Sequence, residues 1–172
     1  EKIGRNMVSE ETTNADLIRC VVIHSKIGGN LLLEKFYSTP GEDLPDAFAR
    51  SKWKEALHDD VRVTMKGREP AEEQVYVGRL RSHNVVWACH GELLVQVVGC
   101  GVYDHLALEE VLKTLIAVIK LLSKQKTVSE ATFLANFGKI SLGLDEVVHL
   151  GQVETLDKDQ VYKAIKLKSA TK

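Results

Sequence analysis

The sequence predicts an α+β fold, a five-stranded antiparallel sheet with helices on both of its faces. Two observations indicate this class. Short turn signals separate runs of β-branched and apolar residues, a pattern typical of hairpins and therefore of antiparallel pairing. Helical apolar spacing dominates the chain after the last of these runs, so the helices are grouped instead of alternating with the strands. The expected order is two strands, a helix, three strands and then two or three helices.

The first hairpin is expected to pair residues 17–24 with residues 31–37, across the turn signal at residues 28–30, where two glycines precede an asparagine. Pro45 suits the first position of a helix, because the backbone N–H that proline lacks would have no partner there. Apolar residues then recur at helical spacing as far as Leu57. A first helix is therefore expected between the two groups of strands.

Three further strands should follow a loop. Residues 58–74 are charged and include a glycine and a proline, so we expect this segment to be mostly loop. The strands are expected at residues 75–81, 85–90 and 93–99, with a turn at residues 82–84. The last strand has apolar residues in both phases of the pleat, which is typical of a strand buried on both faces.

The longest helix should follow Asp104, whose side-chain oxygen can accept a hydrogen bond from a free backbone N–H of the first turn. An apolar stripe at i, i+3 and i+4 spacing runs through residues 108–122. Such a stripe fits either a core helix or a partner-binding helix, and we favour the core. Acidic and basic residues within residues 106–122 argue against a membrane span.

The next helix should begin at Thr127 and Glu130, which together form a capping box. Gly138 and Gly143 weaken this helix, each by roughly 1 kcal/mol relative to alanine. A break in the helix is therefore expected in their region. A short helix at residues 157–166 should end the fold.

The composition predicts one domain in a reducing compartment. A chain of 172 residues suits a single domain, which we place at residues 17–168, after a polar, aperiodic arm at residues 1–16 that we expect to be disordered. The net charge of −1 argues against a nucleic-acid partner. Three cysteines, an odd number, fit a reduced cytosolic protein better than a disulfide framework.

Cysteine and histidine residues lie close together at two places, and we expect structural roles for both groups. Cys89 and His90 are neighbours on a predicted strand, so their side chains should point to opposite faces of the sheet and could not readily chelate one ion. Cys100 and His105 flank a predicted loop without a further cysteine or histidine at metal-site spacing. No metal site, cofactor site or catalytic residue is therefore predicted.

The most informative stretch is residues 144–155, where an acidic pair, Asp145-Glu146, is followed by apolar residues, Gly151 and Glu154-Thr155. Gly151 is expected to end the helix after Leu150, because glycine tolerates a positive φ. We expect one carboxylate of the acidic pair to accept hydrogen bonds from backbone N–H groups at the chain reversal. Acid–base catalysis is the alternative, but adjacent helical carboxylates diverge.

This stretch resembles the matching region of the small subunits of vesicle-coat adaptor complexes: the sigma chains of clathrin adaptors, the zeta chain of the coatomer and the small chain of the TSET/TPLATE complex. The matching residues are Leu144, Asp145, Glu146, Val147, Val148, Gly151, Val153, Glu154 and Thr155. A second run, Leu33, Lys35, Phe36 and Tyr37, resembles the family's apolar-x-Lys-aromatic-Tyr pattern on its second strand. The likeness extends over about residues 17–166, and the element order resembles the family's longin fold.

The resemblance implies a non-enzymatic protein of intracellular transport that needs no cofactor. Such a chain packs into the curved solenoid of a large subunit and reaches the membrane only indirectly, through its complex. It would be cytoplasmic and peripheral on a coated vesicle, an organelle or the plasma membrane. Two alternatives remain: a free-standing regulatory longin domain that binds a SNARE or a small GTPase, and a small enzyme with Cys89 or Cys100 as its nucleophile.

Sigma chains can also bind acidic dileucine sorting peptides, and the resemblance transfers their pocket to six positions. These are Leu32, Gly91, Leu93, Ile116, Gln125 and Lys126. Leu32 stands where sigma chains have a basic residue that faces the acidic part of the peptide. Lys126 replaces an apolar wall residue. These two departures favour a structural chain of the zeta or TSET kind.

Overall fold

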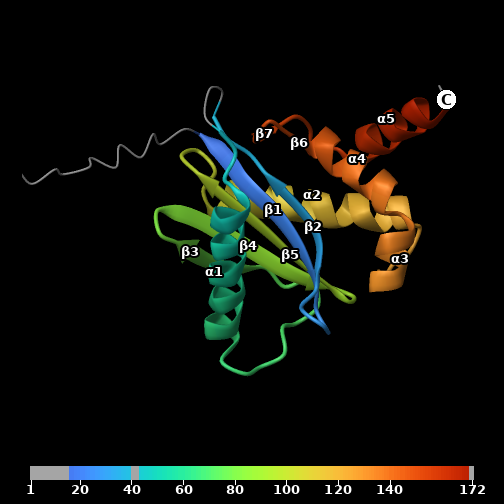
Figure 1. Ribbon diagram of the computed structural model, residues 1–172. Coiled ribbons are helices and arrows are strands. Elements are labelled where there is room, and N and C mark those ends of the chain that lie inside the picture. The colour runs from blue at the N-terminus through green and yellow to red at the C-terminus, as the bar shows by residue number, and fades with distance from the viewer. Residues whose placement is uncertain (1–15, 40–42, 171–172) are drawn as a thin grey trace, which may run out of the picture.

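A five-stranded antiparallel sheet with one helix on one face and four on the other forms the fold of the computed structural model (Figure 1). The structure describes residues 16–39 and 43–170. The sheet has the order β2-β1-β5-β4-β3. The strands are β1 (Leu17–Ser25), β2 (Leu31–Phe36), β3 (Tyr76–Leu80), β4 (His83–His90) and β5 (Leu93–Cys100). The α+β prediction is confirmed, and the predicted arm lies, except for Asp16, outside the described residues.

Among the residues that the structure describes, helix α1 (Ala47–Met65) is the one helix on its face of the sheet. Its N-cap is Asp46, whose carboxylate accepts a hydrogen bond from the backbone N–H of Ala49 at 2.7 Å. The prediction of a loop after residue 57 is wrong, because the helix continues for two more turns to Met65. Packing explains the extension, since Val61 and Met65 are partly buried against the same core as Leu57.

The opposite face carries the long helix α2 (His105–Ser123) and the three C-terminal helices (Figure 1). These are α3 (Glu130–Ala135), α4 (Phe137–Val147) and α5 (Lys158–Ala170), and a small hairpin of β6 (Val148–His149) and β7 (Gln152–Val153) separates the last two. As predicted, Asp104 caps α2 through the N–H of Ala107. No helix among residues 16–39 and 43–170 is long and apolar enough to cross a membrane.

The C-terminal half corrects several predicted boundaries. Ser129 and not Thr127 caps α3, because its hydroxyl accepts from the N–H of Thr132. The predicted helix breaks at Asn136, whose side chain and backbone N–H both donate to the carbonyl of Thr132. Gly143, in contrast, lies inside α4, in a close contact with α2. The last helix also runs further than predicted, to Ala170.

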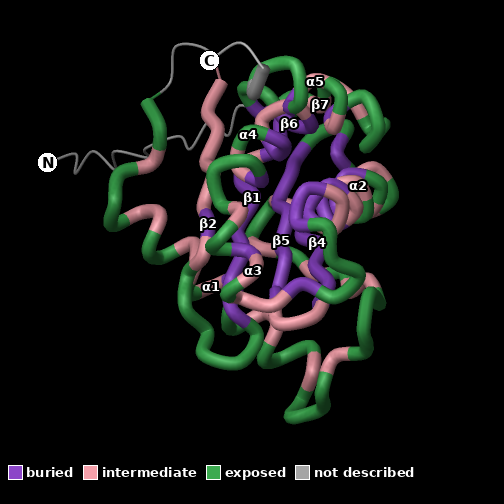
Figure 2. Tube along the Cα trace, turned by 90° about the vertical axis from the view of Figure 1, so that its right-hand side faces the viewer, coloured by how far each residue is buried: buried purple, intermediate pink, exposed green. Residues whose placement is uncertain are grey.

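Two hydrophobic cores lie on the two faces of the sheet, because successive strand residues point in opposite directions. The core on the α1 side contains Cys20, Val22, Leu57, Val85, Trp87, Cys89, Leu94 and Val98. The larger core on the α2 side takes the alternate strand residues and the inner faces of α2, α4 and α5. Strand β5 is buried along its whole length, as predicted, and Figure 2 shows β1, β4 and β5 at the buried centre.

Candidate interaction site

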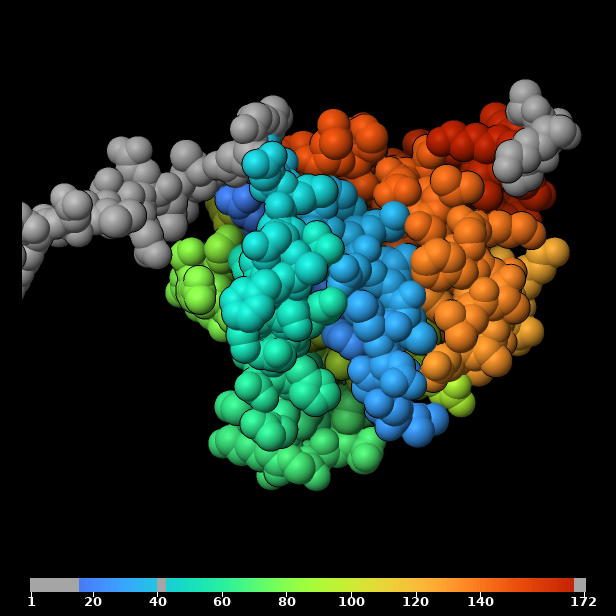
Figure 3. Space-filling view, in the orientation of Figure 1, coloured from blue at the N-terminus to red at the C-terminus, as the bar shows by residue number. Residues whose placement is uncertain are grey.

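The two motifs singled out in the sequence meet in space, at the edge of the sheet. The ammonium group of Lys35 on β2 donates to Asp145 Oδ1 at 2.8 Å and to Ser141 Oγ at 3.1 Å, both on α4. The Lys35 side chain is only 14% exposed, so this contact is shielded from solvent on one side. Figure 3 shows α4 directly beside β2. The acidic motif therefore fastens the C-terminal helices to the edge strand.

Neither carboxylate of the acidic pair has the role that the sequence suggested. Asp145 pairs with Lys35, and Glu146 pairs with Lys168 near the end of α5. No hydrogen bond from a backbone N–H to either carboxylate is found among the described residues. The correction has a simple cause: α4 runs unbroken past both residues, so backbone N–H groups there are occupied within the helix.

Gly151 also differs from its predicted role as a helix terminator. Helix α4 ends at Val147, and Gly151 lies with Leu150 in the turn between β6 and β7, where both residues have a positive φ of +78° and +49°. The carbonyl of Gly151 accepts a hydrogen bond from the N–H of Ile18 at 2.8 Å. A Cβ atom at this position would lie 2.1 Å from Leu17 Cδ1. Only glycine fits here without displacement of β1.

The rest of the motif completes the connection, which we call the clasp: Lys35, Tyr37, Asp145, Gly151 and Glu154. The Tyr37 hydroxyl lies 3.5 Å from the Val148 carbonyl, and burial raises the pKa of this phenol. The N–H of Glu154 donates to the Val147 carbonyl at 2.9 Å. Of the neighbouring motif residues, Leu33 is buried on the α2 side, Phe36 meets Trp53 edge to face, and Thr155 Oγ1 accepts from the N–H of Asp157.

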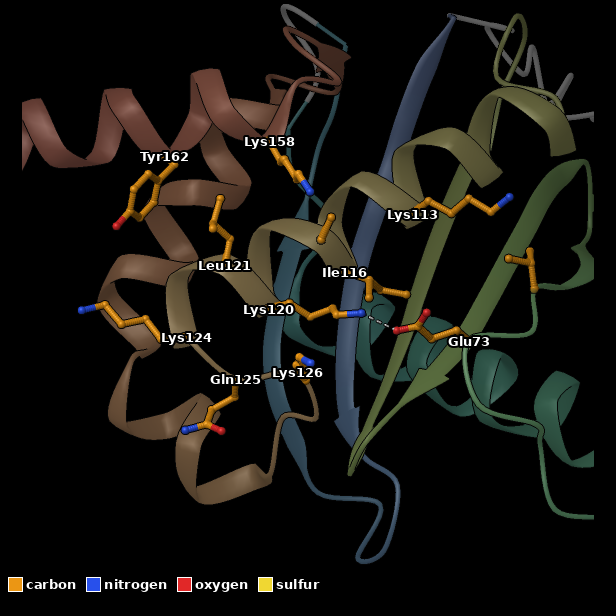
Figure 4. Close-up of a pocket in the computed structure, with 12 residues that line it drawn as sticks. Glu73, Lys113, Ile116, Lys120, Leu121, Lys124, Gln125, Lys126, Lys158 and Tyr162 are labelled. Atoms are coloured by element: carbon orange, nitrogen blue, oxygen red, sulfur yellow. Dashed lines mark hydrogen bonds and ion pairs between the residues drawn. The ribbon is translucent and has the colours of Figure 1, made fainter.

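A cavity of about 690 Å³ lies beside α2, on the side of the fold that α5 and the segment before β3 border (Figure 4). Its apolar floor consists of Val75, Ile116, Ala117 and Leu121, and Tyr162 of α5 forms part of its wall. Lys113, Lys120, Lys124, Lys126 and Lys158 line it as well. The cavity thus combines an apolar floor with a strongly basic rim.

Glu73 is the carboxylate among the described residues that line this cavity. Its Oε1 accepts from the ammonium group of Lys120 at 2.7 Å, which Figure 4 shows as a dashed line. That hydrogen bond lowers the pKa of Glu73, against the opposing effect of burial. Lys120 is therefore already paired within the protein.

A group of potential metal ligands adjoins the cavity. The buried His90 Nδ1 lies 3.0 Å from Glu72 Oε1 and 3.0 Å from Glu73 Oε1, at ion-pair distance but without the alignment of a hydrogen bond. These three groups could in principle hold a metal ion. Glu73 already has a cation in Lys120, and Glu72 accepts from the N–H of Gly91. These contacts join the segment before β3 to β4 and to α2, and this structural role explains the cluster without a metal.

The structure brings together only part of the peptide pocket that the resemblance implied. Ile116, Gln125 and Lys126 line the cavity. Leu93 is fully buried in the core, and Leu32 packs against that core from β2. Gly91 lies in the β4–β5 turn, where a Cβ atom would be 2.4 Å from the carbonyl oxygen of Val128. These last three positions therefore offer no open surface in this cavity.

Sequence reasoning missed most of the basic rim. Lys113 and Lys120 lie at i and i+7 on α2, so the face they share could have been found from their spacing, and Lys124 follows directly as the C-cap residue of the helix. Lys158 and Tyr162 had no such signal, because their place beside α2 depends on how α5 packs on the fold. The lining residue Val75 was expected to begin a strand and instead precedes β3.

The cysteines are poorly suited to nucleophilic chemistry. Burial raises the pKa of Cys89 to about 11, so its thiolate is scarce at neutral pH. Burial also raises the pKa of Cys20. The Cys100 thiol is buried and donates to the Leu17 carbonyl. The face assignment made for Cys89 and His90 is correct, since Cys89 lies in the α1-side core with Val85 and Trp87.

Comparisons with known proteins agree with the motifs. The family model described as clathrin adaptor complex small chain matches residues 17–172. TSET complex member tstD of Dictyostelium discoideum is 28% identical over 144 residues, with 80% of this chain and 86% of that protein covered. Probable coatomer subunit zeta-B of the same organism is 26% identical over 141 residues, with 80% and 74% covered. A chain from a homology model of the full-length AP-3 complex, in a stretched open conformation, has a similar fold. That chain superposes with a TM-score of 0.59 at 16% identity, over 90% of this chain and 95% of the other.

Proposed function

Because this chain belongs to the clathrin adaptor complex small chain family, and is thus a non-enzymatic small subunit of a vesicle-transport coat, we propose that its direct partner is a large solenoid subunit. The observation that carries this proposal is the clasp. Its residues are the family's motif residues, and they connect the C-terminal helices to the sheet. A small domain whose helices and sheet are joined in this way is suited to fill the concave side of a helical solenoid.

A row of residues on the solvent side of α3 and α4 supports a helical partner. Leu134 on α3 and Leu142 on α4 are 51% and 49% exposed, on either side of the break at Asn136, and Gly138 lies one turn before Leu142 with no atom near the position of a Cβ. The solvent side of a helix is normally polar. On α4, Gly138 and Leu142 have the i, i+4 spacing of a ridge that another helix can pack against, and the small residue in it allows close approach. This row is our candidate contact with the large subunit.

The coat is proposed to be of the TSET or coatomer type, attached to the cytoplasmic face of its membrane through the complex. The named Dictyostelium relatives belong to those two complexes. The cavity supports the same choice, because Lys126 makes the rim basic where an apolar wall would be needed for leucine side chains. Leu32 also provides no cation for an acidic peptide. Dileucine cargo is therefore not proposed as a ligand.

Affinity purification of the tagged chain from its own cells tests the partner. We expect a large solenoid polypeptide in near-equal amount, and we expect the double substitution Leu134→Ser and Leu142→Ser to reduce its recovery strongly. The matched control is Val102→Ser with Leu106→Ser, because these side chains are even more exposed, at 66% and 74%. Recovery that is equal for both double variants would remove the α3–α4 row as the contact. A monomer without a large partner would remove the proposal itself.

A further inference from the structure

Positive charge is concentrated in the cavity beside α2, although the whole chain has a net charge of −1. Five lysines line it against the single carboxylate of Glu73. Basic groups around a hollow with a low-dielectric floor focus the electrostatic field and attract anions. The local charge therefore differs in sign from that of the molecule as a whole.

Most of this charge is not neutralised within the fold. Lys120 is paired with Glu73, and Lys113 with Glu109 on the outer side of α2. Lys124, Lys126 and Lys158 have no carboxylate partner in the described part of the chain. Like charges near one another oppose folding, so a cluster of free ammonium groups is more readily explained by a ligand than by stability.

The lysines surround the apolar floor instead of forming a row. Lys113 and Lys120 come from α2, Lys124 and Lys126 from the α2–α3 connection and Lys158 from the start of α5. In Figure 4, Lys158 and Lys126 lie on opposite sides of Ile116, whereas the side chains of Lys113 and Lys124 point outward at the two ends of the view. A ligand near Ile116 would thus meet Lys120, Lys126 and Lys158 from different directions, with Lys113 and Lys124 at the periphery.

We propose that this cavity binds a multiply phosphorylated cyclitol, a ligand of the inositol polyphosphate class. Lysine binds phosphate as a point charge, and phosphates that radiate from a ring match cations distributed around a floor. The C–H faces of the ring can rest on Ala117, Leu121 and the other apolar floor residues. The volume of about 690 Å³ is within the usual range of small-molecule sites. A nucleotide carries its phosphates at one end and would leave several of these lysines unused.

Glu73 is the internal competitor of this ligand. Its carboxylate accepts a hydrogen bond from Lys120, so a phosphate that binds Lys120 must displace it. The Oε1 atom of Glu73 also lies 3.0 Å from His90 Nδ1, so the carboxylate has a second nitrogen close by when a phosphate takes Lys120. Replacement of Glu73 by glutamine removes one negative charge from the cavity and should therefore tighten binding of a polyphosphate.

Titration calorimetry on the full chain, with inositol hexakisphosphate as the probe, tests the proposal. Each lysine lost should weaken binding about 5-fold, the upper end for exposed ion pairs, so Lys126→Gln with Lys158→Gln should weaken it about 25-fold if the two effects add. The control, Lys52→Gln with Lys139→Gln, removes the same charge away from the cavity and should change affinity little. Glu73→Gln should bind more tightly than the unmodified chain. Urea midpoints of all variants establish that they are folded.

A second experiment distinguishes the source of the phosphates. Vesicles that contain phosphatidylinositol 4,5-bisphosphate are compared with phosphatidylserine vesicles of equal charge, and soluble ATP and inorganic phosphate serve as further probes. Vesicle binding that inositol hexakisphosphate competes away indicates a lipid headgroup; binding of the soluble probe alone indicates a free metabolite. Equal affinity for ATP, no response to the lysine pair, or binding only of an acidic apolar peptide would overturn the proposal. These results do not depend on the large subunit, so either proposal can fail alone.

Discussion

Substitution of Gly151 by alanine should destabilise the chain far more than the same change at Gly29. Both glycines lie in hairpin turns with a left-handed backbone, at φ +78° and +66°. An alanine in this conformation costs about 1–2 kcal/mol at either position. At Gly29 nothing lies within 4 Å of the added Cβ atom, so the cost should stop there.

The surroundings of Gly151 add two further costs. The new Cβ atom would lie 2.1 Å from Leu17 Cδ1 and 2.9 Å from the Ile18 carbonyl oxygen. Overpacking of this kind costs about 1–3 kcal/mol. Displacement of the turn would also weaken or break the hydrogen bond from the Ile18 N–H to the Gly151 carbonyl, and such a bond contributes about 0.5–1.5 kcal/mol. The sum is about 2.5–6.5 kcal/mol, a large part of the 5–15 kcal/mol typical of a domain.

Urea denaturation of the three full-length chains measures these differences, with equal m-values as the condition for comparison. A double-mutant cycle then identifies the cause: Leu17→Ala should relieve the clash, so the double variant should lose at least about 1 kcal/mol less than the sum of the single losses. Similar losses for Gly29→Ala and Gly151→Ala, or strict additivity with Leu17→Ala, would refute the reasoning from close approach.

Three other predictions concern buried groups. Gly143→Ala should lower the free energy of unfolding by about 1–2 kcal/mol, because a Cβ there lies 2.5 Å from Leu122 Cδ1 and this overpacking exceeds the gain in helix propensity. Gly138→Ala, on the open side of the same helix, should raise the free energy of unfolding by about 0.4–1 kcal/mol. Urea midpoints in the reverse order would contradict the packing. Cys89, with a pKa of about 11, should react with a maleimide at pH 8 about 100-fold more slowly in the folded than in the unfolded chain; mass spectrometry that finds equal labelling would count against its burial. Burial is the main cause that lowers the pKa of His24, so as the pH falls the unfolded state binds the proton first. The free energy of unfolding should therefore have its full value above about pH 6.5 and decrease below it. Urea curves at pH 7.5 and 5.5 should show a smaller decrease in this free energy for His24→Gln than for the unmodified chain.

The sequence predicted the strands well, because their signals are local. Alternating apolar residues and glycine turns placed all five strands within a few residues, and apolar residues in both phases of β5 indicated its central position. The end of α1 was missed because its second half, after Leu57, is charged and only partly buried. Packing of Val61 and Met65 on the sheet stabilises those turns, and such a contact has no local signature.

The candidate site was predictable only in part, for a similar reason. The sequence identified both halves of the clasp, but their meeting through Lys35 and Asp145 joins residues 110 positions apart. The role assigned to Gly151 was wrong because a helix end and a hairpin turn both accept glycine at positive φ. The role assigned to the acidic pair was wrong because its lysine partners, Lys35 and Lys168, lie on other elements. The basic cavity could be predicted only with knowledge of where α5 packs on the fold, and no sequence pattern indicates that position.

The most direct test of the account compares thermal unfolding of the chain alone with unfolding in its purified complex. If the exposed α3–α4 row is an interface, partner binding at 100-fold above the dissociation constant stabilises the chain by about 2.7 kcal/mol. For a domain of this size the midpoint should then rise by about 5–10 °C. Equal midpoints, with a chain that sediments as a monomer in its own cell extract, would contradict the central claim that this subunit is completed by a larger neighbour.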